Sequence, residues 1–340
     1  MLPEGAGPMA PPGGISRRGL GVGLVGLALP GLALPAAAQG QAWPGDRVIE
    51  AIVPYPPGGG VDIVTRLMMP LVGQQLGGAR IVVTNRPGAS GQLGFEYTFH
   101  AAADGYLLCA VSSPVLQAIP LERQARYRTL EFTFLANAVD DANVVLVLAD
   151  SPLQTLADLA AAAKARPGGL SYGSTGVGSD DHIAMLAFEA GAGLPPMVHV
   201  PFNGAAPSIQ ALLGGHIDLL VANASDGLAL RRDGKVRYLG QASVNRWSAL
   251  ADVPTFREQG FDVLMSATRG FVAPPGLPAP MRERLEAAFT AVFADAGFRR
   301  EAERLGIPLR PLVGGAYASM AAETEAGLRQ LWQVRPWKEG

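Results

Sequence analysis

Short apolar runs of strand length alternate with segments of helical period along most of the 340-residue chain. The strand-like runs lie at residues 48–53, 80–83, 105–111, 171–172, 198–200, 217–221 and 236–239. The helical patterns between them lie at residues 63–76, 92–100, 156–164, 182–190, 207–213 and 228–232. Strands that alternate with helices of this length predict an α/β fold with a parallel sheet covered on both faces.

This alternation is interrupted twice, and each interruption suggests a crossing between two lobes. Around residues 132–148 two apolar runs follow each other without a helical pattern, and residues 260–273 look like a return crossing. Amphipathic patterns at 280–293 and 317–332 predict closing helices. We therefore expect one lobe from residues 44–143 and 268–340, and a second lobe from residues 144–267.

The N-terminal residues have the order of an export signal. Ser16, Arg17 and Arg18 precede an uncharged Gly- and Leu-rich run, and small residues follow as far as Ala38. A basic start, an apolar middle and an Ala-x-Ala site predict a cleaved, twin-arginine-like signal over residues 1–38 and a periplasmic location. A membrane anchor is the alternative, but the apolar run is short and interrupted by glycine against the roughly 20 residues that span a bilayer.

Charge and cysteine content exclude several classes of function. The formal net charge is −2, and removal of Glu4, Arg17 and Arg18 with the signal takes away a net +1 and leaves −3. Without a Lys/Arg cluster in the remainder, nucleic acid is not an expected partner. The single cysteine, Cys109, lies in an apolar run, so we expect a buried core thiol and no intramolecular disulfide.

A Gly-rich loop at residues 54–62, between a predicted strand and a predicted helix, is the first candidate site. Its glycines allow backbone N–H groups to converge, and the start of a helix adds partial positive charge, which together suit a carboxylate or a phosphate. The candidate ligand contacts here are Tyr55, Pro57, Gly58 and Gly59. Asp62 would repel an anion if it pointed inward, so we interpret it as a first-turn cap. A simple tight turn remains the alternative for this loop.

A second Gly-rich loop at residues 173–179 repeats the design and adds hydroxyl groups. The candidate contacts are Ser174, Thr175, Gly176, Gly178 and Ser179. Each hydroxyl can donate to a carboxylate oxygen. Because the two loops stand in different predicted lobes, we expect them to hold one anionic ligand from both sides of a cleft.

Enzyme motifs do not match these loops. Neither loop fits a P-loop, G-x-G-x-x-G or G-x-S-x-G. The four histidines lack paired metal-ligand spacing, so no metal or other cofactor is expected, although His182 follows the second loop and is a possible ligand contact. With no grouping of nucleophile, base and orienting residue, we expect a binding protein rather than an enzyme.

Several motifs stand in the order of a known family. They include VPYPPGGGVDIVTR from Val53, YGSTGVGS from Tyr172, VPFNGAAPSIQALLGGHIDLL from Val200 and DVPTFREQGF from Asp252. In these motifs the chain resembles the Bug-type receptors of tripartite tricarboxylate transporters over essentially the whole length after the signal. The resemblance implies a type II periplasmic binding fold, in which two α/β lobes clamp a carboxylate between the two Gly-rich loops.

The resemblance also implies partners and further contacts. The expected partners are a small carboxylate (a di- or tricarboxylate, an amino acid or an aromatic acid) and a large and a small integral-membrane permease subunit, and the receptor is expected to be a monomer. Ser112, at the end of a predicted strand, is expected to line the cleft, and Asn223 to contact the distal end of the ligand.

The chain departs from the family pattern at two places near the expected cleft. Asn203 stands where lysine is usual, and Thr268 where tryptophan is usual, while the neighbouring Arg269 adds a charge. Arg269 is either a cleft residue or a solvated surface residue. These departures leave the ligand open, and they leave two other functions open as well: a receptor for a sensor kinase, and a periplasmic enzyme built on the same fold.

Overall fold

Two groups of parallel strands, connected by antiparallel strands, form the sheet of the protein. The computed structural model describes residues 43–202 and 204–337, so the predicted signal and Asn203 lie outside the described residues. One parallel group has the order β2-β1-β3 and the other the order β7-β5-β6. Their strands are β1 (Ile49–Val53), β2 (Ile81–Asn85), β3 (Leu107–Ser113), β5 (Ser171–Ser174), β6 (Val198–Pro201) and β7 (Leu219–Asn223).

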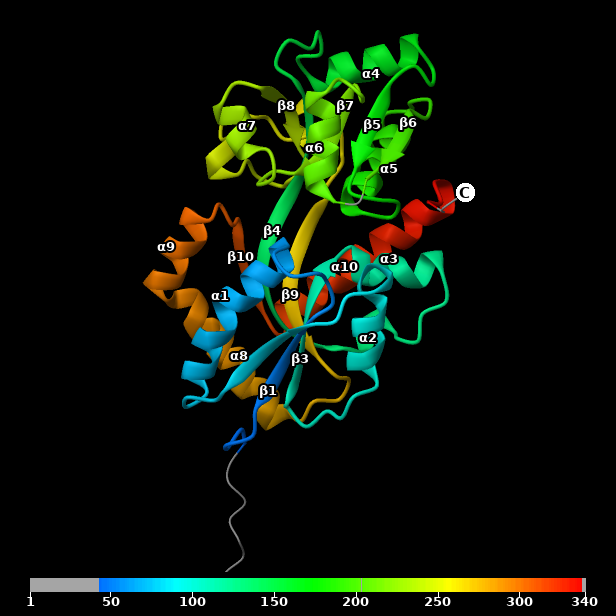
Figure 1. Cartoon of the computed structure of the whole chain (residues 1–340). Helices are drawn as coiled ribbons and strands as arrows, with labels where there is room; N and C mark the ends of the chain where they lie inside the picture. The colour runs from blue at the N-terminus through cyan, green and yellow to red at the C-terminus, as the bar shows by residue number, and fades with distance from the viewer. Residues whose placement is uncertain (1–42, 203, 338–340) are drawn as a thin grey trace, which may run out of the picture. The chain divides into compact units, whose positions relative to one another are not determined.

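The connection between the two groups is made by β4 (Thr133–Leu148) and β9 (Ser266–Ala273), which run antiparallel side by side (Figure 1). Strand β4 pairs with β9 as far as Ala142 and with β7 from Asn143 onward. The two apolar runs at 132–148 are therefore one strand, buried at nearly every position because both faces are covered. The expectation of a parallel sheet is correct for the outer groups and wrong for these joining strands.

Two further strands lie along β4, and ten helices of the described residues surround the sheet. The strands are β8 (Val236–Gln241) and β10 (Leu309–Val313). The helices are α1 (Gly60–Gln75), α2 (Gln92–Phe99), α3 (Val115–Glu122), α4 (Leu156–Ala165), α5 (Asp180–Gly191), α6 (Ala205–Leu213), α7 (Leu228–Arg232), α8 (Ala279–Ala294), α9 (Ala296–Arg304) and α10 (Gly315–Val334).

Three elements, α3, α9 and β10, were not predicted from the pattern. Helix α3 is short and contains Pro120, and β10 contains Pro311, a residue that argues against both helix and strand in a sequence pattern. Most residues of α9 are charged or small, so its apolar face is narrow. In each case packing against the rest of the protein outweighs a weak local signal.

The apolar core is divided between the two groups of strands. One cluster includes Met68 of α1 and Phe289 of α8, and another includes Tyr172 of β5 and Phe188 of α5. Cys109 is fully buried in a third cluster, as predicted. None of the described helices is both long and apolar enough to cross a membrane. The lobe boundaries at 143/144 and 267/268 remain predictions, and they fall within β4 and β9.

Candidate functional site

The first Gly-rich loop connects β1 to α1 and leaves the start of that helix open. Pro57, Gly58 and Gly59 are exposed, and Gly59 occupies the N-cap position of α1 without a side-chain cap. The N–H groups of a first helical turn have no partner within their helix. This loop therefore offers backbone donors and the positive end of a helix dipole to an anion.

Asp62 points back into this loop. Its carboxylate accepts hydrogen bonds from the Gly58 N–H (2.9 Å), from Asn85 Nδ2 (2.9 Å) and from Arg66 Nε (3.0 Å). Burial alone would raise the pKa of Asp62, but the hydrogen bonds from Arg66, Gly58 and Asn85 outweigh it and lower the pKa. Asp62 stands in the first turn of α1, as predicted, but it does not cap the N-cap residue Gly59. It binds the preceding Gly58 N–H instead and so fixes the conformation of the loop.

Tyr55 lies half-buried at the beginning of the same loop. Its ring meets Phe95 edge-on at a centroid distance of 6.4 Å, and its hydroxyl has no hydrogen-bond partner among the described residues. Burial, followed by the nearby Cys109, raises the pKa of Tyr55, so the hydroxyl is neutral and available as a donor or an acceptor.

Arg269 places a cation against the first turn of α1. Arg269 and Ser112 are paired positions of β9 and β3. A Cβ atom on Gly60 would lie only 2.8 Å from Arg269 Cζ, which shows how closely the guanidinium approaches the helix. The Arg269 side chain is 14% exposed, and its Nη2 lies 3.4 Å from Asp141 Oδ2. The alternative of a solvated surface arginine is therefore wrong.

The second Gly-rich loop, between β5 and α5, directs its hydroxyls into its own structure. Ser174 Oγ lies 2.7 Å from His199 Nε2, and Thr175 Oγ1 donates to Asp181 Oδ2 (2.6 Å). Ser179 Oγ caps α5 by accepting the His182 N–H (3.3 Å). In this conformation internal hydrogen bonds hold the loop, and a ligand that bound these hydroxyls would have to replace those hydrogen bonds.

The glycines of this loop also have internal roles. The Gly176 N–H donates to Ser174 Oγ (3.2 Å), and the Gly178 N–H donates to His182 Nδ1 (3.1 Å). Gly178 has φ +72°, and a Cβ atom there would lie 2.0 Å from Glu122 Oε1 of α3. The contacts of all five predicted loop residues with a ligand therefore remain predictions.

His182 and His199 form a stacked pair beneath the second loop. Their ring centroids are 3.9 Å apart with an interplanar angle of 8°, and the Tyr172 ring stacks on His199 at a centroid distance of 4.9 Å. Burial lowers the pKa of His182 to about 3 and that of His199 to about 4. The sequence pointed to His182, which follows the second loop, but not to His199. A strand pattern does not show that a histidine on β6 contacts the loop that follows β5.

The neutral histidine pair predicts a pH dependence of stability. A histidine with a lower pKa in the folded state than its ordinary value of 6.5 stabilises the fold fully above about pH 6.5, and this contribution is lost as the pH falls toward the folded pKa. We expect the melting temperature to fall less steeply between about pH 6.5 and about pH 4.5 in His182→Asn than in the parent. Melting curves across this range measure the slope, with the exposed His216→Gln as the control. Equal slopes in all three proteins would contradict the lowered pKa of His182 in the folded state.

Asn223 connects the two halves of the site. Its Nδ2 donates to the Asp141 carbonyl oxygen (3.1 Å) and to Asp180 Oδ2 (2.8 Å). The structure thus forms a continuous series of contacts from the first loop through Arg269, Asp141 and Asn223 to the start of α5. Asp141 and Asp180 were not predicted from the sequence, although Asp141 interrupts an apolar run and Asp180 directly follows the second loop.

A cavity of about 850 Å³ lies on the other face of β4 and β9. Side chains alternate between the two faces of a strand, so Asp140, Ala142 and Thr268 line this cavity while Asp141 and Arg269 face the loops. None of the eleven predicted ligand contacts lines it. Its one cationic lining residue, Arg310, is paired with Asp140. The exposed glycines and the Arg269 guanidinium, the groups suited to an anion, lie at the loops and not in this cavity.

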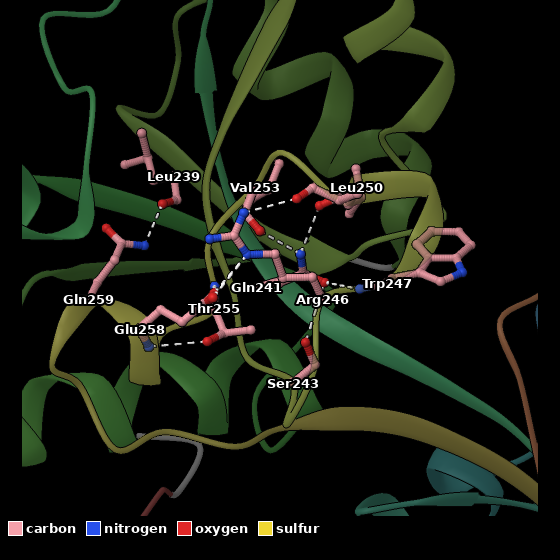
Figure 2. A network of polar contacts seen from close by, with 11 residues as sticks. Leu239, Gln241, Ser243, Arg246, Trp247, Leu250, Val253, Thr255, Glu258 and Gln259 are labelled. Carbon is pink, nitrogen blue, oxygen red and sulfur yellow. Dashed lines mark hydrogen bonds and ion pairs between the residues drawn. The ribbon is translucent and has the colours of Figure 1, made fainter.

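One rim of this cavity is held by a network of polar contacts after β8 (Figure 2). Gln241 donates to the carbonyl oxygens of Leu250 and Val253 and accepts from the Trp247 N–H (2.9 Å). Glu258 accepts from Arg246 and from the Thr255 N–H. The DVPTFREQGF motif therefore has a structural role here, since it fixes the segment that carries Trp247.

Comparison with known proteins shows the family of the chain. The family model "Tripartite tricarboxylate transporter family receptor" matches residues 64–324. The BugT protein of Bordetella pertussis is 34% identical over 68% of this chain and 71% of its own length. A protein of Cupriavidus necator is 31% identical over 84% of this chain and 86% of its own length.

Solved structures show the same fold. A TctC solute-binding protein from Polaromonas, without ligand, has a TM-score of 0.76 and 30% identity, covering 86% of this chain and 99% of its own. MatC from Rhodopseudomonas palustris, with bound malate, has a TM-score of 0.70 and 27% identity, covering 84% of this chain and 98% of its own.

The two-lobed α/β architecture with a Gly-rich loop at the start of α1 and of α5 defines a type II periplasmic binding protein, a class that binds solutes and is not enzymatic. Within this class the chain belongs to the tripartite tricarboxylate transporter family of receptors, the family of the Bug proteins.

Proposed function

We propose that this receptor binds a small carboxylate at the loops that begin α1 and α5, and delivers it to the large and small membrane subunits of a tripartite tricarboxylate transporter. The observation that carries the proposal is the Arg269 guanidinium against the open first turn of α1, beside the exposed Gly58 and Gly59. A guanidinium and a helix N-terminus both favour a carboxylate. The malate bound to MatC, a 27% identical relative, supports the same ligand class.

The proposal includes export and closure of the lobes. The signal at residues 1–38 would be removed near Ala38 during export to the periplasm. The lobes, residues 44–143 with 268–340 and residues 144–267, would close about β4 and β9. A ligand that contacts both lobes stabilises the closed state through contacts that the open state lacks.

A thermal-shift screen of the protein without its signal tests the proposal. A ligand at 100 times its dissociation constant stabilises the fold by about 2.7 kcal/mol. Because the entropy of unfolding is about 2.1 cal/mol/K per residue, 1 kcal/mol corresponds to roughly 1.6 °C in a protein of about 300 residues, and a rise of about 4 °C is expected with the best carboxylate. The panel contains mono-, di- and tricarboxylates, amino acids and aromatic acids, with sugars and divalent metals as controls. A rise with a sugar or a metal, and with no carboxylate, would contradict the proposal.

A further inference from the structure

Four aspartates gather on the face of the sheet that carries Arg269. Asp141 and Asp181 are fully buried or nearly so, Asp180 is 7% exposed, and Asp226 is half-buried. Besides burial, the charge of Asp180 raises the pKa of Asp141. Besides burial, the charges of Asp141 and Asp180 raise the pKa of Asp226. We refer to Asp141, Asp180, Asp181 and Asp226 as the acidic group.

Most hydrogen-bond donors to the acidic group are neutral. Asn143 Nδ2 donates to Asp180 Oδ2 (2.8 Å) and to Asp181 Oδ1 (2.7 Å). The N–H of Ser225 donates to Asp141 Oδ1 (3.1 Å), and its hydroxyl to Asp141 Oδ2 (2.5 Å). Among the described residues, Arg269 is the one cation that forms an ion pair with any of the four carboxylates.

The acidic group therefore has more negative charge than its surroundings compensate. Burying an unpaired carboxylate is costly, and the fold responds by favouring protonation. Burial, together with neighbouring Asp180, raises the pKa of Asp181 well above its ordinary value. Burial and the charge of Asp141 raise the pKa of Asp226 to about 6. A cation at this place would relieve the imbalance.

A second observation points to a missing donor. Asn143 is 1% exposed, and its Oδ1 has no hydrogen-bond partner among the described residues. Flipping the Asn143 amide would be unfavourable, because Oδ1 would then face the carboxylates of Asp180 and Asp181 in place of Nδ2. Asn143 and Asn223 both donate to Oδ2 of Asp180 rather than to its Oδ1. The site thus presents one buried acceptor that lacks a donor, beside carboxylates that lack a cation.

We infer that the ligand of this receptor is a zwitterion, whose ammonium group is held by Asp180, Asp226 and Asn143 Oδ1 while its carboxylate meets Arg269 and the first turn of α1. The inference rests on the proposed function and narrows its carboxylate to an amino acid or a similar amino carboxylate. An ammonium group has three N–H donors, which matches the three acceptors. No group of three or more His, Cys, Asp or Glu side chains in the described part of the chain is arranged to hold a metal ion, which favours an ammonium over a metal.

Matched pairs of acids test the inference. Each pair consists of a 2-hydroxy acid and the amino acid of the same skeleton: malate and aspartate, 2-hydroxyglutarate and glutamate, lactate and alanine, phenyllactate and phenylalanine. Calorimetric titration near pH 7 is expected to show at least about tenfold tighter binding of the amino acid in every pair that binds. Equal or tighter binding of the hydroxy acid would overturn the inference and leave the carboxylate receptor intact. If neither these acids nor any other carboxylate binds, the proposed function itself fails.

Isosteric variants assign the preference to the acidic group. Asp226→Asn and Asp180→Asn are expected to weaken binding of the amino acid by about tenfold or more, with the hydroxy acid unaffected or bound more tightly. Asp150→Asn, at an exposed turn, is the matched control and is expected to keep the parent preference. Melting curves without ligand show whether each variant is folded. Because Asp226 is only half-buried, Asp226→Asn is expected to disturb folding less than Asp180→Asn. If both variants are folded and retain the parent preference, the ammonium is not held by these aspartates.

Discussion

Replacing Arg269 by glutamine is expected to weaken carboxylate binding by about 10- to 150-fold, because hydrogen bonds to a charged group contribute roughly 1.5–3 kcal/mol. The same change should lower stability by roughly 3 kcal/mol, since it leaves buried Asp141 without its cation. Calorimetric titration with the carboxylate found by screening measures the first effect, and chemical denaturation measures the second.

A double variant separates the two effects of Arg269. In Arg269→Gln/Asp141→Asn the uncompensated buried charge is gone, so most of the lost stability is expected to return. Binding should stay weak, because the guanidinium that meets the ligand is still missing. If Arg269→Gln binds the carboxylate as tightly as the parent, Arg269 is only the structural partner of Asp141.

Gly178→Ala is expected to destabilise the protein by about 2–5 kcal/mol, the second of the two large effects. The backbone of Gly178 has φ +72°, which costs an L-residue roughly 1–2 kcal/mol. A methyl group would also lie 2.0 Å from Glu122 Oε1, the atom that accepts the Trp337 indole N–H (2.6 Å). Overpacking of this kind costs a further 1–3 kcal/mol or so. Chemical denaturation measures the loss.

A matched glycine isolates the contact from the backbone strain. Gly168 has a similar φ of +69°, and a Cβ atom there meets nothing within 4 Å. Gly168→Ala should therefore cost only the strain, about 1–2 kcal/mol. Equal losses in Gly168→Ala and Gly178→Ala would show that the second loop does not pack tightly against α3 and the C-terminal residues.

The sequence is sufficient to predict those parts of the protein that depend on local pattern. The loop at residues 54–62 combines a buried strand, exposed glycines and a helix start, and each of these has a local signal. Helix α7 is found at the residues predicted for it, and α1 and α5 begin two or three residues before the predicted apolar pattern, at their caps. The capping positions Gly59 and Ser179 explain this difference.

Features that depend on contacts between distant segments were not predictable in the same way. Arg269 is a cleft residue because β9 pairs with β3 in the register that places it beside Ser112, 157 positions away along the chain (269 minus 112). The hydroxyl of Ser174 meets His199 because β5 and β6 are neighbours. Residues 140–142 alternate between the two faces of β4, but which face carries the cavity and which the loops depends on the pairing of β4 with β9. Local patterns suggested that these residues were polar but not which groups they would meet.

The central claim, that a small carboxylate is held at the loops beginning α1 and α5, is tested most directly by a crystal structure of the protein with its best carboxylate. The account predicts carboxylate oxygens at about 2.7–3.2 Å from backbone N–H groups at the start of α1, and from the Arg269 guanidinium. A ligand found instead in the 850 Å³ cavity on the opposite face, beside Thr268 and Met265, would contradict it.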